Sequence, residues 1–168
     1  MATSRTIERT VRVVRDPGGS RRRRLGVAMV VLLLVQAVLG VGNELWTSLP
    51  ASGDPFTGAT PVWLLSAHVL VGTTVVVVAV VLLVSARRAR DRAWTVPSLL
   101  GLLAVTGAWA SGHFFLVTFG DDALSLSMAV LAMAAVGAYV AGLVRAGASS
   151  AGAPGASSEE QPWDGVAR

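Results

Sequence analysis

The two histidines are the residues of this chain whose type and spacing could do chemistry. His68 and His113 are the only histidines, and each lies inside a long apolar segment. Ionisable side chains inside a membrane are costly, and they usually face the interior of a bundle or a cavity. At 1.5 Å per residue, each lies roughly 8–9 Å below the outer end of its segment. The two segments run in opposite directions, so this matched depth is not imposed by sequence spacing.

Haem ligation is the chemistry that these two imidazoles could perform together. Two neutral imidazoles on facing helices can ligate one iron axially, which would make haem b the cofactor. Gly72 lies one turn from His68, and Gly112 adjoins His113, so a flat macrocycle would have room. Met128 is an alternative ligand. No arginine lies on the outer side to pair with haem propionates, which argues against this interpretation.

Two other interpretations of the histidines remain open, and the first is favoured. A neutral imidazole can hydrogen-bond across helices, which contributes roughly 0.6 kcal/mol and at most about 2 kcal/mol. Asn43, Ser66 and Ser111 are available partners. The second interpretation is a zinc site in which both histidines and Glu44 are the ligands.

Further polar side chains fall near the level of the histidines. Their common level predicts a polar chamber in the outer leaflet, open to the outside. No hydrolytic constellation and no glycine-rich phosphate loop accompany them, and the absence of cysteine excludes disulfides and cysteine-ligated metals. The predicted chamber residues are Gln36, Asn43, Glu44, Ser66, Ser125 and Ser127, with Met128 beside them.

Four apolar segments must position these side chains. They cover about residues 25–45, 62–84, 94–118 and 124–144. Each is long enough to cross a bilayer core as a helix, for which roughly 20 residues are needed. Two of the connections are short, so consecutive helices should be antiparallel neighbours. The sequence therefore predicts an all-α membrane protein, an antiparallel up-down-up-down four-helix transmembrane bundle.

Arginine falls on one side of the predicted membrane. All 14 basic residues are arginine, and they lie before residue 25, in the loop 85–93 or from residue 145 onward. The positive-inside rule places both termini and that loop in the cytoplasm of a multi-pass plasma-membrane protein. We expect a basic cytoplasmic tail at 1–24, a transmembrane domain at 25–145 and a disordered cytoplasmic tail at 146–168, because its composition cannot bury a core.

Composition also limits the partners. Apolar residues make up 53% of the chain, and the basic charge flanks membrane segments, so we expect no nucleic-acid partner. Membrane lipid is an expected partner, because an arginine face attracts anionic headgroups. A partner membrane protein or a second copy of the chain is another.

Small residues and tryptophans predict how the helices pack. Small side chains recur every four residues on two helices, which allows close approach in lipid. We expect the valine-rich half of 75–84 to face lipid and three tryptophans to lie in the headgroup layers. The small residues are Ala104, Ala108 and Gly112, then Ala134, Ala138 and Gly142; the tryptophans are Trp46, Trp63 and Trp94.

Several short motifs lie in the four segments and their loops. They are Asn43-Glu44-Leu45-Trp46, Pro50, Ala67-His68 with Gly72, Gly112, Phe114-Phe115-Leu116, Ser127-Met128-Ala129 and Tyr139. These motifs resemble those of a group of small four-helix integral membrane proteins of high-GC Gram-positive bacteria. The likeness covers about 25–145 and implies topology, with no assigned activity. A fainter likeness is to one half of haem A synthase, where a first span and an outer loop also precede a histidine. That enzyme's other histidine lies where this chain has Ser127 and Met128.

Two functions follow from these patterns. The small-residue stripes and the incomplete catalytic set favour a non-catalytic small membrane protein or an accessory subunit of a larger membrane complex. The alternative is a b-type haem-binding electron-transfer protein with His68 and His113 as axial ligands. Transport is a weaker hypothesis, because no inverted repeat and no broken helix is visible.

Overall fold

Four long helices make up the body of the molecule. The computed structural model describes residues 17–48, 53–58, 61–118 and 121–151. The long helices are α1 (Pro17–Trp46), α3 (Val62–Arg88), α4 (Arg92–Val117) and α5 (Asp122–Ala151), and the short α2 (Pro55–Gly58) lies between α1 and α3. All four long helices are long and apolar enough to cross a membrane. The predicted fold class, an all-α four-helix bundle, is confirmed.

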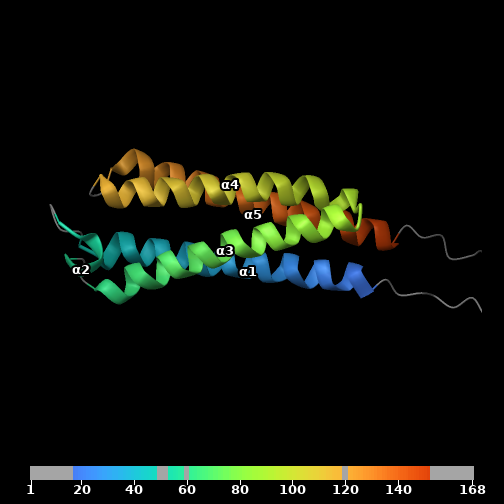
Figure 1. Ribbon diagram of the computed structural model, residues 1–168, viewed down its shortest axis with the longest axis horizontal. Coiled ribbons are helices and arrows are strands. Elements are labelled where there is room, and N and C mark those ends of the chain that lie inside the picture. Colours follow the sequence, from blue (N-terminus) through green and yellow to red (C-terminus); the bar gives the residue numbers. More distant parts are fainter. Residues whose placement is uncertain (1–16, 49–52, 59–60, 119–120, 152–168) are drawn as a thin grey trace, which may run out of the picture.

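The helices form a closed ring in which each packs against two neighbours. Helix α1 contacts α3 and α5, and α4 contacts the same two helices, with the α4–α5 interface the most extensive. Figure 1 shows the four helices side by side along their length, with the start of α1 and the end of α5 at one end and α2 at the other. This is the up-down-up-down arrangement. We call the end that holds Arg22 the arginine end.

The core follows a heptad spacing. On α1, the buried residues Arg22, Gly26, Met29 and Leu33 lie alternately four and three positions apart. This spacing keeps one seam of a helix facing its neighbours in a left-handed bundle. Half-buried residues continue the same seam to the other end of α1. The residues that continue the α1 seam are Gln36, Gly40 and Asn43. The equivalent seams on the next two long helices are His68, Gly72, Val75, Ala79, Leu82 and Ala86 on α3, and Trp94, Ser98, Gly101 and Val105 on α4.

Trp94 is a core residue, which corrects its predicted place in a headgroup layer. Its side chain is 1% exposed, whereas Trp46 and Trp63 are 69% and 65% exposed. A Cβ atom on Gly26 of α1 would overlap the Trp94 ring, and one on Gly142 of α5 would lie 3.0 Å from it. Glycines on two other helices therefore open a slot that holds the indole inside the bundle.

The predicted packing faces of α3 and α5 also need correction. On α3, Val75, Ala79 and Leu82 are buried while the valines between them are exposed or half-buried, so this half of the helix faces both the core and the surroundings. On α5 the buried face is that of Ala135 rather than Ala134. Tyr139, four positions after Ala135, is fully buried, and its ring sits against Gly101 of α4. Of the predicted stripe, Gly142 is buried and Ala138 is half-buried.

The long helices extend past the predicted spans at the arginine end. Helix α1 begins at Pro17 rather than near residue 25, and α5 continues to Ala151, so residues 146–151 are helical rather than disordered. The half-buried Ala146 of α5 packs against the core in this extension. The predictions for 1–16 and 152–168 lie outside the described residues.

Gly101→Ala should lower the stability of the bundle. A Cβ atom there would lie 2.5 Å from Tyr139 Cζ. Overpacking of this kind costs about 1–3 kcal/mol. The measurement is thermal unfolding in detergent, followed by circular dichroism. Gly137→Ala on α5 is the control, because nothing lies within 4 Å of a Cβ atom there. Equal unfolding midpoints for the two variants would contradict the packing of the Tyr139 ring against Gly101.

Candidate functional site

His68 is held between α3 and α1 by a side-chain hydrogen bond. Its Nε2 lies 3.0 Å from Gln36 Nε2. Gln36 Nε2 can donate to His68 Nε2 in the tautomer whose ring proton lies on Nδ1. Gln36 Oε1 and His68 Nδ1 are buried with no hydrogen-bond partner among the described residues. His68 is therefore paired with Gln36 across the α1–α3 interface.

Two glycines make room for this pair. A Cβ atom on Gly40 would lie 3.3 Å from His68 Cε1, and one on Gly72 would lie 3.0 Å from Gln36 Nε2. Each glycine lies one turn from the polar residue on its own helix and faces the polar residue of the other helix. The space that the sequence assigned to a macrocycle beside Gly72 is thus occupied by the Gln36 side chain.

His113 lies on the outside of the bundle. Its imidazole is exposed and stacks on Trp109, with ring centroids 6.1 Å apart and planes 10° from parallel. Phe114 meets the same imidazole edge-on at 6.2 Å. The Trp109 indole N–H donates to Thr73 Oγ1 of α3 at 3.4 Å, which links this aromatic group to the neighbouring helix.

The two histidines therefore have separate surroundings. His68 faces α1, whereas His113 contacts rings of its own helix at the surface. Met128 Sδ lies against Gly112, between α4 and α5. A haem held by both imidazoles would need both of them in the α3–α4 gap, so these contacts do not support it, and haem ligation stays a prediction.

The zinc interpretation has no support in the described residues either. Glu44, its third ligand, is exposed. Within the described part of the chain, no three His, Asp or Glu side chains are close enough to hold a metal ion.

The other predicted chamber residues form separate contacts. Asn43 Nδ2 donates to Leu39 O at 2.9 Å and to Leu64 O of α3 at 3.4 Å, and its Oδ1 accepts from Thr47. Ser127 of α5 pairs with Ser111 of α4 at 3.2 Å. Glu44 and Ser66 are exposed, and Ser125 is half-buried. Three of these residues, Gln36, Asn43 and Ser127, thus form contacts between neighbouring helices, and a common chamber stays a prediction.

Asp91 is the charged residue that sequence reasoning missed. It follows a turn in which Arg90 N donates to Arg87 O and Asp91 N donates to Ala86 O, the arrangement that closes many helices. Arg90 has the left-handed φ of 52° that this motif requires. Asp91 then caps α4, since its Oδ1 accepts from Ala93 N at 3.1 Å. An acid directly before a helix was the available signal.

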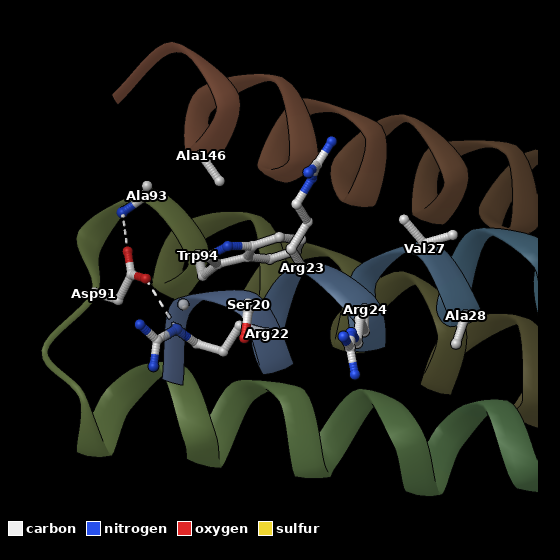
Figure 2. Close-up of a pocket in the computed structure, with 11 residues that line it drawn as sticks. Ser20, Arg22, Arg23, Arg24, Val27, Ala28, Asp91, Ala93, Trp94 and Ala146 are labelled. Carbon is white, nitrogen blue, oxygen red and sulfur yellow. Dashed lines mark hydrogen bonds and ion pairs between the residues drawn. The ribbon is translucent and has the colours of Figure 1, made fainter. Parts of the chain in front are cut away.

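The second carboxylate oxygen of Asp91 ties the α3–α4 turn to α1. Arg22 Nε donates to Asp91 Oδ2 at 3.0 Å, with side chains only 11% and 23% exposed (Figure 2). This ion pair forms one wall of a groove of about 930 Å³ between the start of α1, the start of α4 and the end of α5. Its other lining residues are Gly19, Ser20, Arg23, Arg24, Val27, Ala28, Ala93, Trp94 and Ala146.

Comparison with known proteins adds no assignment. No protein-family model, no curated protein and no solved structure matches the chain. The resemblances drawn from its short motifs therefore stay expectations.

Asp91→Ala should destabilise the protein by about 2 kcal/mol, because it removes the α4 cap and the partner of Arg22. Asp91→Asn should cost about half as much, because the amide oxygen can still cap the helix. Thermal unfolding in detergent at low and high salt measures both effects, and salt should weaken the ion-pair part.

The matched control is Asp121→Ala. Asp121 Oδ1 accepts from Ala123 N at 2.8 Å at the start of α5, and this carboxylate is exposed. Its replacement removes a cap without removing an ion pair from a part-buried site. Equal losses in Asp121→Ala and Asp91→Ala would show that the ion pair contributes nothing.

Proposed function

We propose that the chain is a multi-pass plasma-membrane protein with both termini in the cytoplasm, acting as a non-catalytic accessory subunit bound to another membrane protein. The observation that carries the accessory role is the exposed polar and aromatic surface of α3 and α4. This surface, the α3–α4 face, consists of Thr73, Trp109, His113 and Phe114.

Charge supports the orientation. All 14 basic residues of the chain are arginine and lie in segments that flank the arginine end, while the loops at the other end hold only acidic charge. Translocation disfavours short loops that are rich in Lys or Arg, so the arginine end belongs on the cytoplasmic side.

The α3–α4 face supports a partner. An imidazole that faces lipid leaves a polar N–H group without the hydrogen bond that water would supply. A hydrogen bond from a neighbouring transmembrane helix removes this cost and contributes roughly 0.6 kcal/mol, up to about 2 kcal/mol. Trp109 and Phe114, 47% and 57% exposed, flank the imidazole with large rings. Aromatic residues of this kind are enriched at protein interfaces.

The polar pairs inside the bundle support a non-catalytic role. The partners of His68 and Ser127 are the side chains of Gln36 and Ser111 on adjacent helices. Each pair joins two helices in the way that structural hydrogen bonds in membrane proteins do.

Cysteine labelling tests the orientation. The chain has no cysteine, so Ser48→Cys and Ala89→Cys each introduce a single exposed thiol at opposite ends of the bundle. A membrane-impermeant maleimide should label Ser48→Cys in intact cells and Ala89→Cys only after permeabilisation. The reverse pattern would contradict the proposed orientation.

Site-specific cross-linking tests the accessory role. A photo-reactive phenylalanine analogue in place of Phe114, on the α3–α4 face, should give an adduct of one discrete mass in native membranes. His113→Leu should lower its yield by roughly threefold, the effect of one interhelical hydrogen bond. The yield is measured on immunoblots of the full-length protein.

Leu126 is the matched control for this experiment. It is 66% exposed on α5 and lies one turn from the loop that joins α4 and α5, as Phe114 does. The analogue at Leu126 should give no discrete adduct. Equal adducts at both positions, or none at Phe114, would contradict a partner on the α3–α4 face, and an adduct with the mass of two tagged copies would identify the partner as a second copy.

A further inference from the structure

The groove at the arginine end changes from cationic to apolar along one helix. Arg23 and Val27 are four positions apart on α1, as are Arg24 and Ala28, and all four residues line the groove. Residues four apart lie one above the other on the same face of a helix. Figure 2 shows Arg23 on the side of Val27 and Arg24 on the side of Ala28, with both apolar residues farther from the end of the bundle.

The ion pair leaves two arginines of this groove exposed. Arg22 is 9% exposed and is engaged by Asp91, whereas Arg23 and Arg24 are exposed. Figure 2 shows the Arg23 side chain extending across the groove towards α5. Guanidinium groups present several N–H donors in a planar fork that matches the oxygens of a phosphate. The end of the groove that holds Arg23 and Arg24 therefore suits a phosphate group.

The end of the groove that holds Val27 and Ala28 suits hydrocarbon. Val27 is 50% exposed and lies at the start of a membrane-spanning helix, pointing away from the core. Trp94 forms the inner wall. A ligand that fills the whole groove must carry an anionic group at one end and an apolar chain at the other. A soluble acidic peptide or a nucleic acid would leave Val27 and Ala28 uncovered.

We propose that this groove is a binding site for an anionic phospholipid, with the headgroup phosphate at Arg23 and Arg24 and the first part of an acyl chain along Val27 and Ala28. This site rests on the proposed function, in which the arginine end lies at the membrane surface, where lipid phosphates meet the first part of the acyl chains. Basic pockets between transmembrane helices bind anionic headgroups in this manner. Arg22 and Asp91 position the site by fixing the α3–α4 turn against α1.

Native mass spectrometry of the full-length protein in neutral detergent tests the proposal. Phosphatidylglycerol and phosphatidylcholine with identical acyl chains are added separately, and the bound fraction is measured. We expect tighter binding of phosphatidylglycerol. Arg23→Gln with Arg24→Gln should weaken it by about thirtyfold, since each arginine near an anionic headgroup changes affinity by about fivefold.

Arg87→Gln with Arg88→Gln is the matched control, because it removes the same charge from exposed residues at the end of α3, outside this groove. Its affinity should change much less than that of the groove variant, because neither side chain lines the groove. An equal loss in both double variants would show attraction to net charge and overturn the site. Unchanged binding in Arg23→Gln with Arg24→Gln would also overturn it.

Two further arms complete the test. Inorganic phosphate at millimolar concentration should not displace the lipid; displacement at that concentration would show that the groove holds free phosphate and would overturn the lipid assignment. Should the double variant fail to fold, as judged by circular dichroism, Arg24→Gln alone replaces it, with an expected loss of about fivefold. An undiminished affinity in that folded variant would overturn the proposal.

Discussion

The fold depends on large side chains of one helix that fit against glycines of its neighbours. Helices in lipid gain little from the hydrophobic effect, so their association relies on close packing and interhelical hydrogen bonds. Trp94 fits against Gly26 and Gly142, and Tyr139 fits against Gly101. At these positions the glycine lets the two backbones approach while the ring fills the space between them. Because the core residues follow a heptad spacing, glycines such as Gly26 and Gly101 lie on the side of their helix that faces its neighbours.

The same principle organises the polar residues. Gly40 and Gly72 make room for the bond between Gln36 and His68, so these polar side chains of two helices face each other inside the bundle instead of facing lipid. At the arginine end, Asp91 makes three contacts. Its N–H donates to the last turn of α3, one carboxylate oxygen caps α4, and the other accepts from Arg22. The polar groups inside the bundle thus hold helices together, whereas His113 lies exposed on its surface.

The sequence predicted much of the fold, because apolar length and arginine distribution are local signals. It predicted four spans and their order. It could not predict the place of Trp94, which depends on Gly26 and Gly142, glycines far away in the chain, nor the burial of Ala135 and Tyr139 on α5. For the candidate site, it identified His68 and Gln36 as polar residues but not as partners. The depth of His113 could be estimated from spacing, whereas its direction depends on how α4 is rotated in the bundle.

A double-mutant cycle on Gly26 and Trp94 tests the packing of large side chains against glycines most directly. The free energy of unfolding in detergent is measured for Gly26→Ala, Trp94→Leu and the double variant. The three atoms nearest to a Cβ on Gly26 all belong to the indole ring of Trp94. Gly26→Ala should therefore be destabilising in the presence of Trp94 and nearly neutral in the Trp94→Leu background, a coupling of about 1–3 kcal/mol. Additive effects of the two substitutions would contradict the account.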